Sequence, residues 1–192
     1  PAGARKVKEL VLTYESLWDE RPKPPPPTTH YCTIKIKSTP KLNGNMPQIN
    51  PSVRAELARI IHDMLERGII EPGTGPYSST VLLLPKPKGG LRFVLDYRAL
   101  NACIETDAYT LPQVEEVLST LHGSTLFSAI DIKEAFWSVP LDEESKQLTG
   151  FRTPIGLFQY TRMPMGLKTA SAVFCRFLDS IVGDLRWSVA LT

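Results

Sequence analysis

The stretch from Ser124 to Leu141, which reads STLFSAIDIKEAFWSVPL, constrains this chain more than any other. An apolar, strand-like run leads up to one acidic residue, Asp131, and aromatic residues follow it at once. Burying a carboxylate in such a run is unfavourable unless the carboxylate is paired or holds a cation. Two interpretations follow: Asp131 hydrogen-bonds a turn at the end of a strand, or it is a functional carboxylate.

Other blocks along the chain bear on this choice. Upstream lies Leu91 to Asn101 (LRFVLDYRALN), and downstream lie Phe151 to Gly156 (FRTPIG) and Arg162 to Phe174 (RMPMGLKTASAVF). In this order and spacing the blocks resemble the fingers and palm of a reverse transcriptase, with most similarity to gypsy-type LTR retrotransposons. That pattern reads V-D-Y-R-x-L-N, then L-D, F-x-T-x-x-G and M-P-F-G-L. Glu134 to Leu141 looks more like the retroviral version, because the retrotransposon pattern usually has Ser-Gly-Tyr there.

The resemblance implies a mixed α/β (α+β) fold class. It is that of right-hand polymerase fingers and palm, incomplete, without the catalytic Asp-Asp hairpin, the thumb and the connection. The implied division is an N-terminal helix and proline-rich linker (1–27), fingers with a β-hairpin flap (28–122) and a partial palm (123–192). The implied lineage is that of RNA-directed DNA polymerases, which transfer nucleotides by a two-metal mechanism when complete.

The implied chemistry needs two Mg²⁺ ions about 4 Å apart, held by several oxygen ligands. By resemblance, Asp131 is the first catalytic carboxylate and a metal ligand, and the backbone carbonyl of Ile132 is a further ligand. The family places the other two carboxylates in a Tyr-x-Asp-Asp hairpin beyond the helix near the C-terminus. The sequence, which ends in WSVALT, does not contain that pair. We therefore expect this stretch alone not to polymerise.

The resemblance also implies a site for the incoming deoxynucleotide (dNTP). Arg92 matches the family arginine that contacts the phosphates, and Lys86 matches the flap lysine. Phe136 matches the aromatic residue beneath the sugar that rejects a 2′-hydroxyl, while plain core packing also explains a phenylalanine here. Met165 and Gly166 match the M-P-x-G segment that packs against nucleotide and template, with Met165 replacing the usual Phe or Gln. The implied partner is an RNA or DNA template with its primer.

Two β-rich runs, Ser79 to Leu84 and Leu91 to Tyr97, flank a loop that ends in Gly89-Gly90. Such a glycine pair suits a tight turn with positive φ, so the runs predict a β-hairpin. The net charge of +2 is too small to indicate nucleic-acid binding by itself. Basic residues do cluster around the hairpin, where they face either phosphates or only solvent: Lys86, Lys88, Arg92 and Arg98.

Helices are predicted before this hairpin. An apolar face recurs from Val7 to Trp18, which predicts a short docked helix that stops near Glu20, ahead of a proline-rich linker. Asn50 and Pro51 provide an N-cap and a first-turn proline for a second helix, and Gly68 ends it.

The remaining segments predict both strands and helices. His30 to Lys37 alternates between apolar and polar residues, as a half-buried strand does. Thr110 to Leu121 begins with a capping-box signature and predicts a helix, and Pro154 to Gly156 predicts a turn between two strands. A last helix is expected from Thr169 to Val182. Its predicted buried residues are Ala172, Cys175, Leu178 and Ile181, with Phe174 and Phe177 beside them.

The three cysteines are odd in number and far apart, and none forms a C-x-x-C pair, so they indicate neither a disulfide framework nor a zinc site. This favours an intracellular, reducing compartment, which is compatible with the cytoplasm, the nucleus or an organelle. No apolar run approaches the length of a membrane span, so no membrane partner is expected.

An alternative of another class stays open. A domesticated, catalytically dead relative of reverse transcriptases would serve as a scaffold or binding module, with protein partners in a larger assembly. The aspartate pair absent from the sequence favours this alternative, whereas the retained Asp131, Arg92 and Phe136 favour a polymerase.

Overall fold

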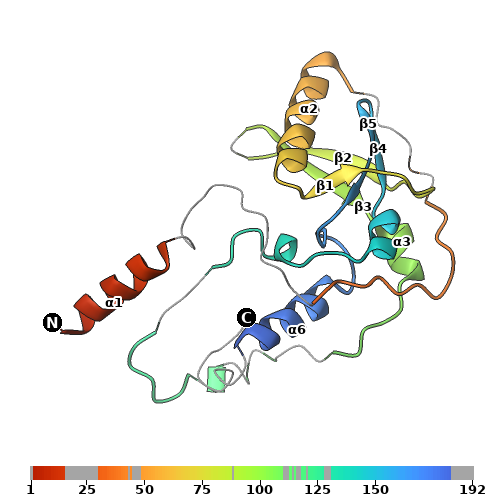
Figure 1. Cartoon of the computed structure of the whole chain (residues 1–192). Coiled ribbons are helices and arrows are strands. Elements are labelled where there is room, and N and C mark those ends of the chain that lie inside the picture. Colours follow the sequence, from red (N-terminus) through yellow and green to blue (C-terminus); the bar gives the residue numbers. More distant parts are fainter. Residues whose placement is uncertain are drawn as a thin grey trace.

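Two small antiparallel sheets pack against each other, and helices α2 (Pro51–Glu66) and α5 (Glu143–Leu148) contact them (Figure 1). This mixture of strands and helices is the α/β class expected from the sequence. The structure is a computed structural model of the 192-residue chain. It describes residues 2–15, 30–42, 44, 49–87, 89–109, 113, 115, 118–119, 121–127 and 131–182.

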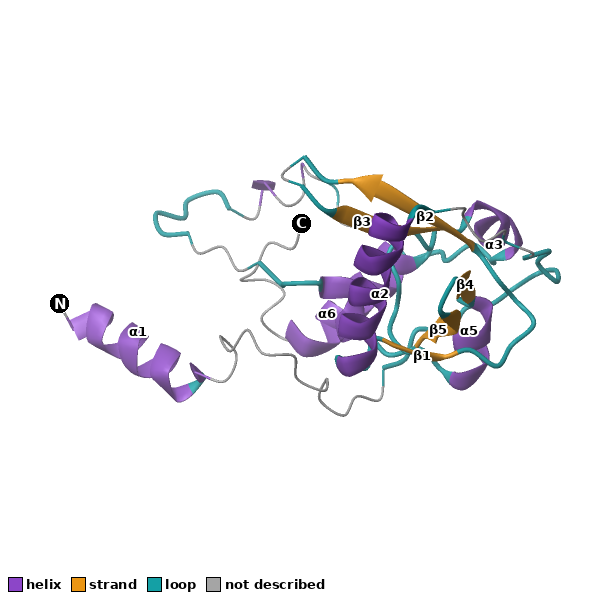
Figure 2. Cartoon of the chain, turned by 90° about the horizontal axis from the view of Figure 1, so that it is seen from above, coloured by secondary structure: helices purple, strands orange, loops and turns teal. Residues whose placement is uncertain are grey.

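Helices and strands are interspersed along the chain. Their bounds are α1 Ala2–Thr13, α2 Pro51–Glu66, β1 Ile70–Pro72, β2 Thr80–Pro85, β3 Leu91–Asp96, α3 Arg98–Cys103, the 3₁₀ helix η2 Ala135–Ser138, α5 Glu143–Leu148, β4 Phe151–Thr153, β5 Gly156–Tyr160 and α6 Ala170–Val182. Helix α2 lies beside the strands, whereas α1 stands apart from them (Figure 2).

Strands β2 and β3 form the predicted hairpin. They pair in antiparallel register, so that Leu84 lies opposite Arg92. Gly89 and Gly90 in the connecting loop have φ angles of +89° and +81°, which side chains with a Cβ adopt only at a cost. The glycine pair therefore makes the turn as expected.

The other sheet has the strand order β1-β5-β4, with both pairings antiparallel. Ile70 of β1 lies opposite Tyr160 of β5, and Phe151 of β4 lies opposite Phe158 of β5. Gly156, with a φ of +151°, begins β5 directly after the turn between the two strands. This confirms the predicted strand–turn–strand unit.

Aromatic packing joins the two sheets at Phe151, which is fully buried. Its ring centroid lies 5.2 Å from that of Phe93 in the hairpin, 5.9 Å from Phe158 and 5.7 Å from Tyr160. Aromatic pairs at such distances add stabilisation beyond the area that they bury. The hairpin is thus anchored to the three-stranded sheet by its inner face.

Helix α2 begins and ends where the sequence predicts. The Asn50 side chain accepts a hydrogen bond of 2.9 Å from the backbone N–H of Val53, and Pro51 occupies the first turn. Gly68 follows the helix with a φ of +62°. The residues of α2 that are buried in the core are Leu57, Ile61 and Met64.

The run from His30 to Lys37 shows the predicted alternation, since Cys32 and Ile34 are buried and their neighbours are exposed. It forms isolated bridges instead of a continuous strand, because Cys32 pairs with Leu141 in parallel and Ile36 pairs with Ile104 in antiparallel orientation. Residues 30–37 therefore connect the chain at Leu141 with the chain at Ile104.

Two helix predictions need correction. Helix α1 ends at Thr13, short of Glu20, and its apolar face is exposed instead of docked, because it contacts no other described element closely enough to bury Leu10. The proline-rich linker lies outside the described residues. In α6 the predicted Ile181 is 63% exposed, and Ala172, Cys175 and Leu178 are only partly buried. The apolar side chains of this helix that pack against the core are Val173 and the two phenylalanines expected beside the buried face, Phe174 and Phe177.

The strand expected before Asp131 is not formed in its described parts, residues 124–127 and 131–132. Leu126 and Phe127 are 91% and 65% exposed. A strand needs a hydrogen-bonded neighbour, and no described strand lies beside this segment. The expectation of an apolar strand around Asp131 is therefore wrong for the described residues.

The capping box at Thr110 lies outside the described residues, as does most of the helix predicted after it. Among the described residues, no helix is long and apolar enough to span a membrane.

Candidate functional site

The block from Leu91 to Asn101 turns sharply after β3, and a carboxylate holds the turn. Asp96 accepts hydrogen bonds from the backbone N–H of Arg98, at 3.1 Å, and from its guanidinium Nη2, at 2.6 Å. The side-chain hydrogen bonds from Arg98 are the main reason that the pKa of Asp96 falls to about 2. Asp96 is therefore ionised at neutral pH and hydrogen-bonded to Arg98, and it stabilises the turn.

Tyr97, which lies between Asp96 and Arg98, is buried, and burial raises the pKa of its phenol well above the usual range. Its hydroxyl donates to the carbonyl of Thr149 at 3.4 Å. A Cβ added to Gly166 would lie 3.7 Å from the Tyr97 ring, so the ring supports the loop at Gly166. Burial thus keeps Tyr97 neutral and places it beneath a candidate site residue.

Asn101 ties the two most distinctive sequence blocks together. Its Nδ2 donates to the carbonyl of Gly166 at 2.8 Å, and its Oδ1 accepts from the backbone N–H of Lys168 at 2.8 Å. These bonds span more than sixty positions along the chain. The side chain of Asn101 thereby fixes the loop that carries Met165 and Gly166. Sequence reasoning did not single out Asn101, although its place in the matched block is a signal for it.

Met165 and Gly166 lie in the open at this loop. Met165 is 54% exposed, which is unusual for a large apolar side chain unless it meets a partner. Gly166 has a φ of +92°, a conformation that favours glycine. The structure therefore leaves both candidate residues accessible.

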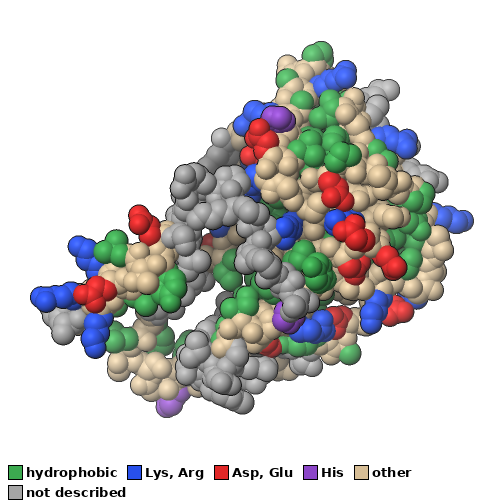
Figure 3. Space-filling view, in the orientation of Figure 1, with side chains coloured by type: hydrophobic (Ala, Val, Ile, Leu, Met, Phe, Trp, Pro, Cys, Tyr) green, Lys and Arg blue, Asp and Glu red, His purple; other side chains and the backbone are tan. Residues whose placement is uncertain are grey.

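The basic candidates lie on the hairpin. Arg92 and Lys86 are exposed, and Lys88 lies outside the described residues. Arg92 projects from the outer face of the hairpin, whose apolar residues Leu82 and Leu84 are also exposed. Elsewhere, the face seen in Figure 3 shows basic side chains interspersed with acidic ones. On the face that Figure 3 shows, the basic side chains therefore form no continuous basic surface.

Asp131 and Ile132 are exposed, and Asp131 forms no hydrogen bond or ion pair with any described residue. An open carboxylate next to a backbone carbonyl offers oxygen ligands of the kind that Mg²⁺ prefers. Within the described part of the chain, no group of three acidic, histidine or cysteine residues could hold a metal ion. Asp131 fits one ligand position of a metal site, and one carboxylate alone does not complete a two-metal site.

Phe136 lies in the short helix η2 and is half-buried. Its ring meets Phe174 of α6 edge-on, at 5.6 Å between centroids and an angle of 82°. Phe136 therefore packs against Phe174, as the core-packing interpretation predicts, and part of its ring stays accessible.

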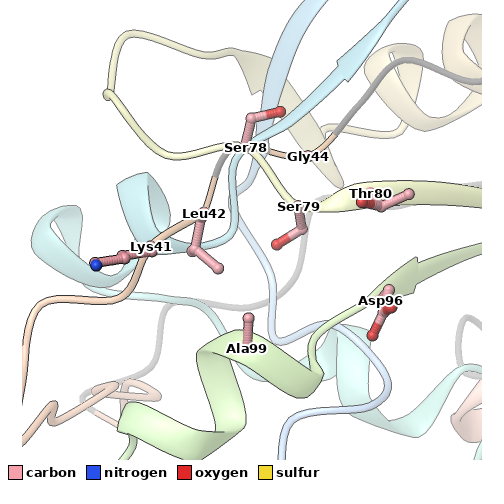
Figure 4. Close-up of a pocket in the computed structure, with 8 residues that line it drawn as sticks. All are labelled: Lys41, Leu42, Gly44, Ser78, Ser79, Thr80, Asp96 and Ala99. Carbon is pink, nitrogen blue, oxygen red and sulfur yellow. The ribbon is translucent and has the colours of Figure 1, made fainter.

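A cavity of about 220 Å³ lies beside Asp96 at the base of the hairpin (Figure 4). The side-chain hydroxyls of Ser78 and Ser79 are buried there without a hydrogen-bond partner among the described residues, and Figure 4 shows the Ser79 hydroxyl directed toward the space above Ala99. Buried hydroxyls without partners are unfavourable, so a bound polar group or water would stabilise them. The residues lining the cavity are Lys41, Leu42, Gly44, Ser78, Ser79, Thr80, Asp96 and Ala99.

A contact that sequence reasoning missed involves Arg67, just after α2. Its guanidinium forms an ion pair with Glu134, which lies between Asp131 and Phe136 in sequence. The two residues are 67 positions apart, and no local pattern pairs them. Only the fold brings Arg67 to the candidate site.

The comparisons with known proteins agree with this arrangement. A sequence model of the family described as reverse transcriptase (RNA-dependent DNA polymerase) matches residues 84–191 of the chain. The enzymatic polyprotein of Cauliflower mosaic virus (strain Strasbourg) is 33% identical over 182 residues, which are 91% of this chain and 26% of that polyprotein. The transposon Tf2-3 polyprotein of Schizosaccharomyces pombe (strain 972 / ATCC 24843) is 32% identical over 155 residues, 81% of this chain and 11% of that polyprotein. The chain spans about a quarter or less of the length of these curated relatives.

Solved structures show the same fold. A crystal structure of a mutant prototype foamy virus protease-reverse transcriptase has a TM-score of 0.82 at 25% identity, covering 96% of this chain and 25% of that one. The foamy viral protease-reverse transcriptase in complex with an RNA/DNA hybrid has a TM-score of 0.73 at 20% identity, covering 95% of this chain and 25% of that one.

Proposed function

Because the chain belongs to the reverse transcriptase (RNA-dependent DNA polymerase) family, we propose that it binds a primer–template duplex and an incoming dNTP as polymerase fingers and partial palm. The hydrogen bonds of Asn101 carry this proposal. They bring the block at Arg92 to Asp96 and the block at Met165 to Gly166 into one unit, beside an accessible hairpin. Such an arrangement presents cations and an apolar side chain toward one ligand.

In this proposal the hairpin binds phosphate. The guanidinium of Arg92 and the ammonium of Lys86 are exposed donors that pair with the triphosphate of the dNTP. Phe136 lies beneath the sugar, and Met165 with Gly166 contacts the base pair. These roles come from the family resemblance, and the accessibility of the four side chains and of Gly166 supports them.

Asp131 and the carbonyl of Ile132 would hold Mg²⁺. When bound, the metal ions would activate the primer hydroxyl and stabilise the leaving pyrophosphate. The exposed position of Asp131 supports this assignment, since a ligand must reach the ion without first breaking a protein contact. The domain boundaries at residues 27 and 122, an intracellular compartment and protein partners in a larger assembly are parts of the same proposal.

Nucleic-acid binding provides the test. We expect the chain to bind a primer–template duplex weakly, with an affinity that falls steeply as salt concentration rises. The variant Lys86→Ala/Lys88→Ala/Arg92→Ala should bind less tightly and reduce the dependence of log affinity on log salt by about 1 for each lost contact.

A matched control removes the same charge elsewhere. Arg5→Ala/Lys6→Ala/Lys8→Ala alters exposed cations on α1, which stands apart from the hairpin. It should leave both the affinity and its salt dependence unchanged. Binding that is insensitive to salt, or equal in the two triple variants, would contradict a phosphate-binding hairpin and favour the scaffold alternative.

A further inference from the structure

The structure assigns Arg67 as a positioning residue: we infer that its contacts with Glu134 and Trp137 hold the turn that carries Phe136 at the nucleotide site. This inference rests on the proposed function, and it goes beyond it by adding Arg67, the residue directly after helix α2. Three elements meet at this side chain, namely the end of α2, the backbone after Asp131, and η2.

Arg67 is well placed to connect these elements. Its backbone N–H donates to the carbonyl of Asp63 at 3.0 Å, which fixes the residue to the end of α2. Its Nη1 donates to the Asp63 carboxylate at 3.3 Å, and its Nη2 donates to the Glu134 carboxylate. The Arg67 side chain is only 21% exposed, so solvent screens these interactions less than those of a surface pair.

The same guanidinium also lies over an aromatic ring. Its Cζ is 5.2 Å from the centroid of Trp137, a distance typical of a cation–π contact. A planar guanidinium can pair with a carboxylate and stack on a ring at once, whereas an ammonium cannot do both with the same geometry. Arg67 therefore contacts Glu134 and Trp137, the residues directly before and after Ala135 and Phe136.

The contact with Arg67 stabilises an unfavourable backbone conformation at Glu134. It has φ 53° and ψ 41°, and it is the non-glycine residue with positive φ among the described residues. An L-residue with a side chain keeps this left-handed conformation only where its surroundings hold it there. The carbonyl of Glu134 then accepts the N–H of Trp137 at 2.8 Å and starts η2. The direction of the Phe136 ring follows from this turn.

The other end of the turn is already fixed by the core. Val139 and Leu141 are buried, and they exchange backbone hydrogen bonds with Thr161 and Met163. On the Asp131 side, the described residues 131–133 are exposed and form no side-chain hydrogen bond or ion pair. Arg67 thus restrains the chain at Glu134, between the exposed residues 131–133 and the buried residues Val139 and Leu141.

The first experiment measures nucleotide choice. With primer–template and Mg²⁺ present, the wild-type chain is titrated with a dNTP and with the matching ribonucleotide, and the ratio of affinities is compared among variants. Arg67→Met should lower the preference for the dNTP about tenfold, the scale of coupling between residues in contact, while leaving primer–template affinity unchanged. Arg67→Lys, which keeps the charge but not the stacking, should lie between the two.

Two further variants separate positioning from a general structural role. Arg59→Met removes an arginine of α2 that pairs with Glu56 on the same helix, and it should not alter the preference. Glu134→Asn introduces a residue that adopts the left-handed conformation more readily. Combined with Arg67→Met, it should restore most of the preference, because the turn no longer depends on the ion pair.

A second readout does not depend on nucleotide binding. In a background where Trp18 and Trp187 are replaced by phenylalanine, the fluorescence of Trp137 should shift in Arg67→Met and not in Arg59→Met. If the wild type binds and discriminates nucleotides and Arg67→Met does so equally, the positioning role is overturned and the proposed function stands. If the wild type binds no nucleotide, the proposed function fails, and an unchanged Trp137 signal in Arg67→Met would overturn the positioning of the turn by Arg67 as well.

Discussion

The segments that end in Asp96 and in Asp131 begin from similar sequence and reach opposite environments. Each is an apolar run that leads to an aspartate. Asp96 is the last residue of β3, which pairs with β2 across a tight turn, and its side chain is 21% exposed and bound to Arg98. Asp131 is exposed and without a described partner, and its flanking residues form no strand in their described parts.

The difference shows what an apolar run needs in order to become a strand. The hairpin supplies β3 with a neighbour a few residues away, so its backbone groups are paired locally. The segment before Asp131 would need a neighbour from elsewhere in the chain, and the described residues provide none. One aspartate therefore shapes the backbone, whereas the other stays available to a cation.

The packed region should respond most strongly to loss of an aromatic side chain. Phe151→Ala removes a fully buried ring that contacts both sheets, and it should lower the free energy of unfolding by about 3–5 kcal/mol. Phe127→Ala, at an exposed position in the open segment, should change it by no more than about 0.5 kcal/mol. Denaturant unfolding of the two variants provides the measurement. Equal losses would show that the segment before Asp131 is packed after all.

Loss of the link made by Asn101 should have an intermediate effect. Asn101→Ala removes two hydrogen bonds to the loop at Gly166 and Lys168 and should destabilise the chain by about 1–2 kcal/mol. Asn101→Asp keeps the acceptor for Lys168 but sets a carboxylate oxygen against the Gly166 carbonyl, so it should cost at least as much as Asn101→Ala. Hydrogen exchange at residues 165–168 should accelerate in both variants. A variant that leaves exchange unchanged would show that the loop holds its shape without Asn101.

The Asp96 carboxylate should make stability depend on pH in acid. Its pKa of about 2 in the folded chain lies below the ordinary value of 3.8, so the unfolded state takes up the proton first as pH falls. The contribution is complete above about pH 4 and is lost as pH falls through 2. Because Arg98 is 88% exposed, we expect well under about 1 kcal/mol. Asp96→Asn should flatten the unfolding free energy across this pH range, and an unaltered acid profile in that variant would contradict the assignment.

The smallest effect on stability is expected at Asp131. Asp131→Asn should change the free energy of unfolding by no more than about 0.5 kcal/mol, as for a surface position, while it weakens the Mg²⁺ dependence of dNTP binding. Thermal melting and nucleotide titration with and without Mg²⁺ measure the two effects. A cost of roughly 3 kcal/mol or more would instead reveal a buried, paired carboxylate.

Local features were predictable because the residues that make them are neighbours in sequence. Asn50 caps α2, and Gly89-Gly90 turns the hairpin, since each depends on the backbone of a few consecutive residues. The predictions that are wrong all depended on a distant partner. The docking of α1, the strand before Asp131 and the burial of Ile181 each assumed a neighbour that the described fold does not supply.

Motif order and local periodicity, which the chain carries in its sequence alone, were enough to predict the family and the class of fold, and they nominated the residues of the candidate site. Which of these residues are held by hydrogen bonds and which are exposed follows from the fold alone. It paired Arg67 with Glu134 and Asn101 with Gly166, across separations at which no sequence pattern specifies a contact. Such contacts form only when the packing of the core offsets the entropy of closing long loops.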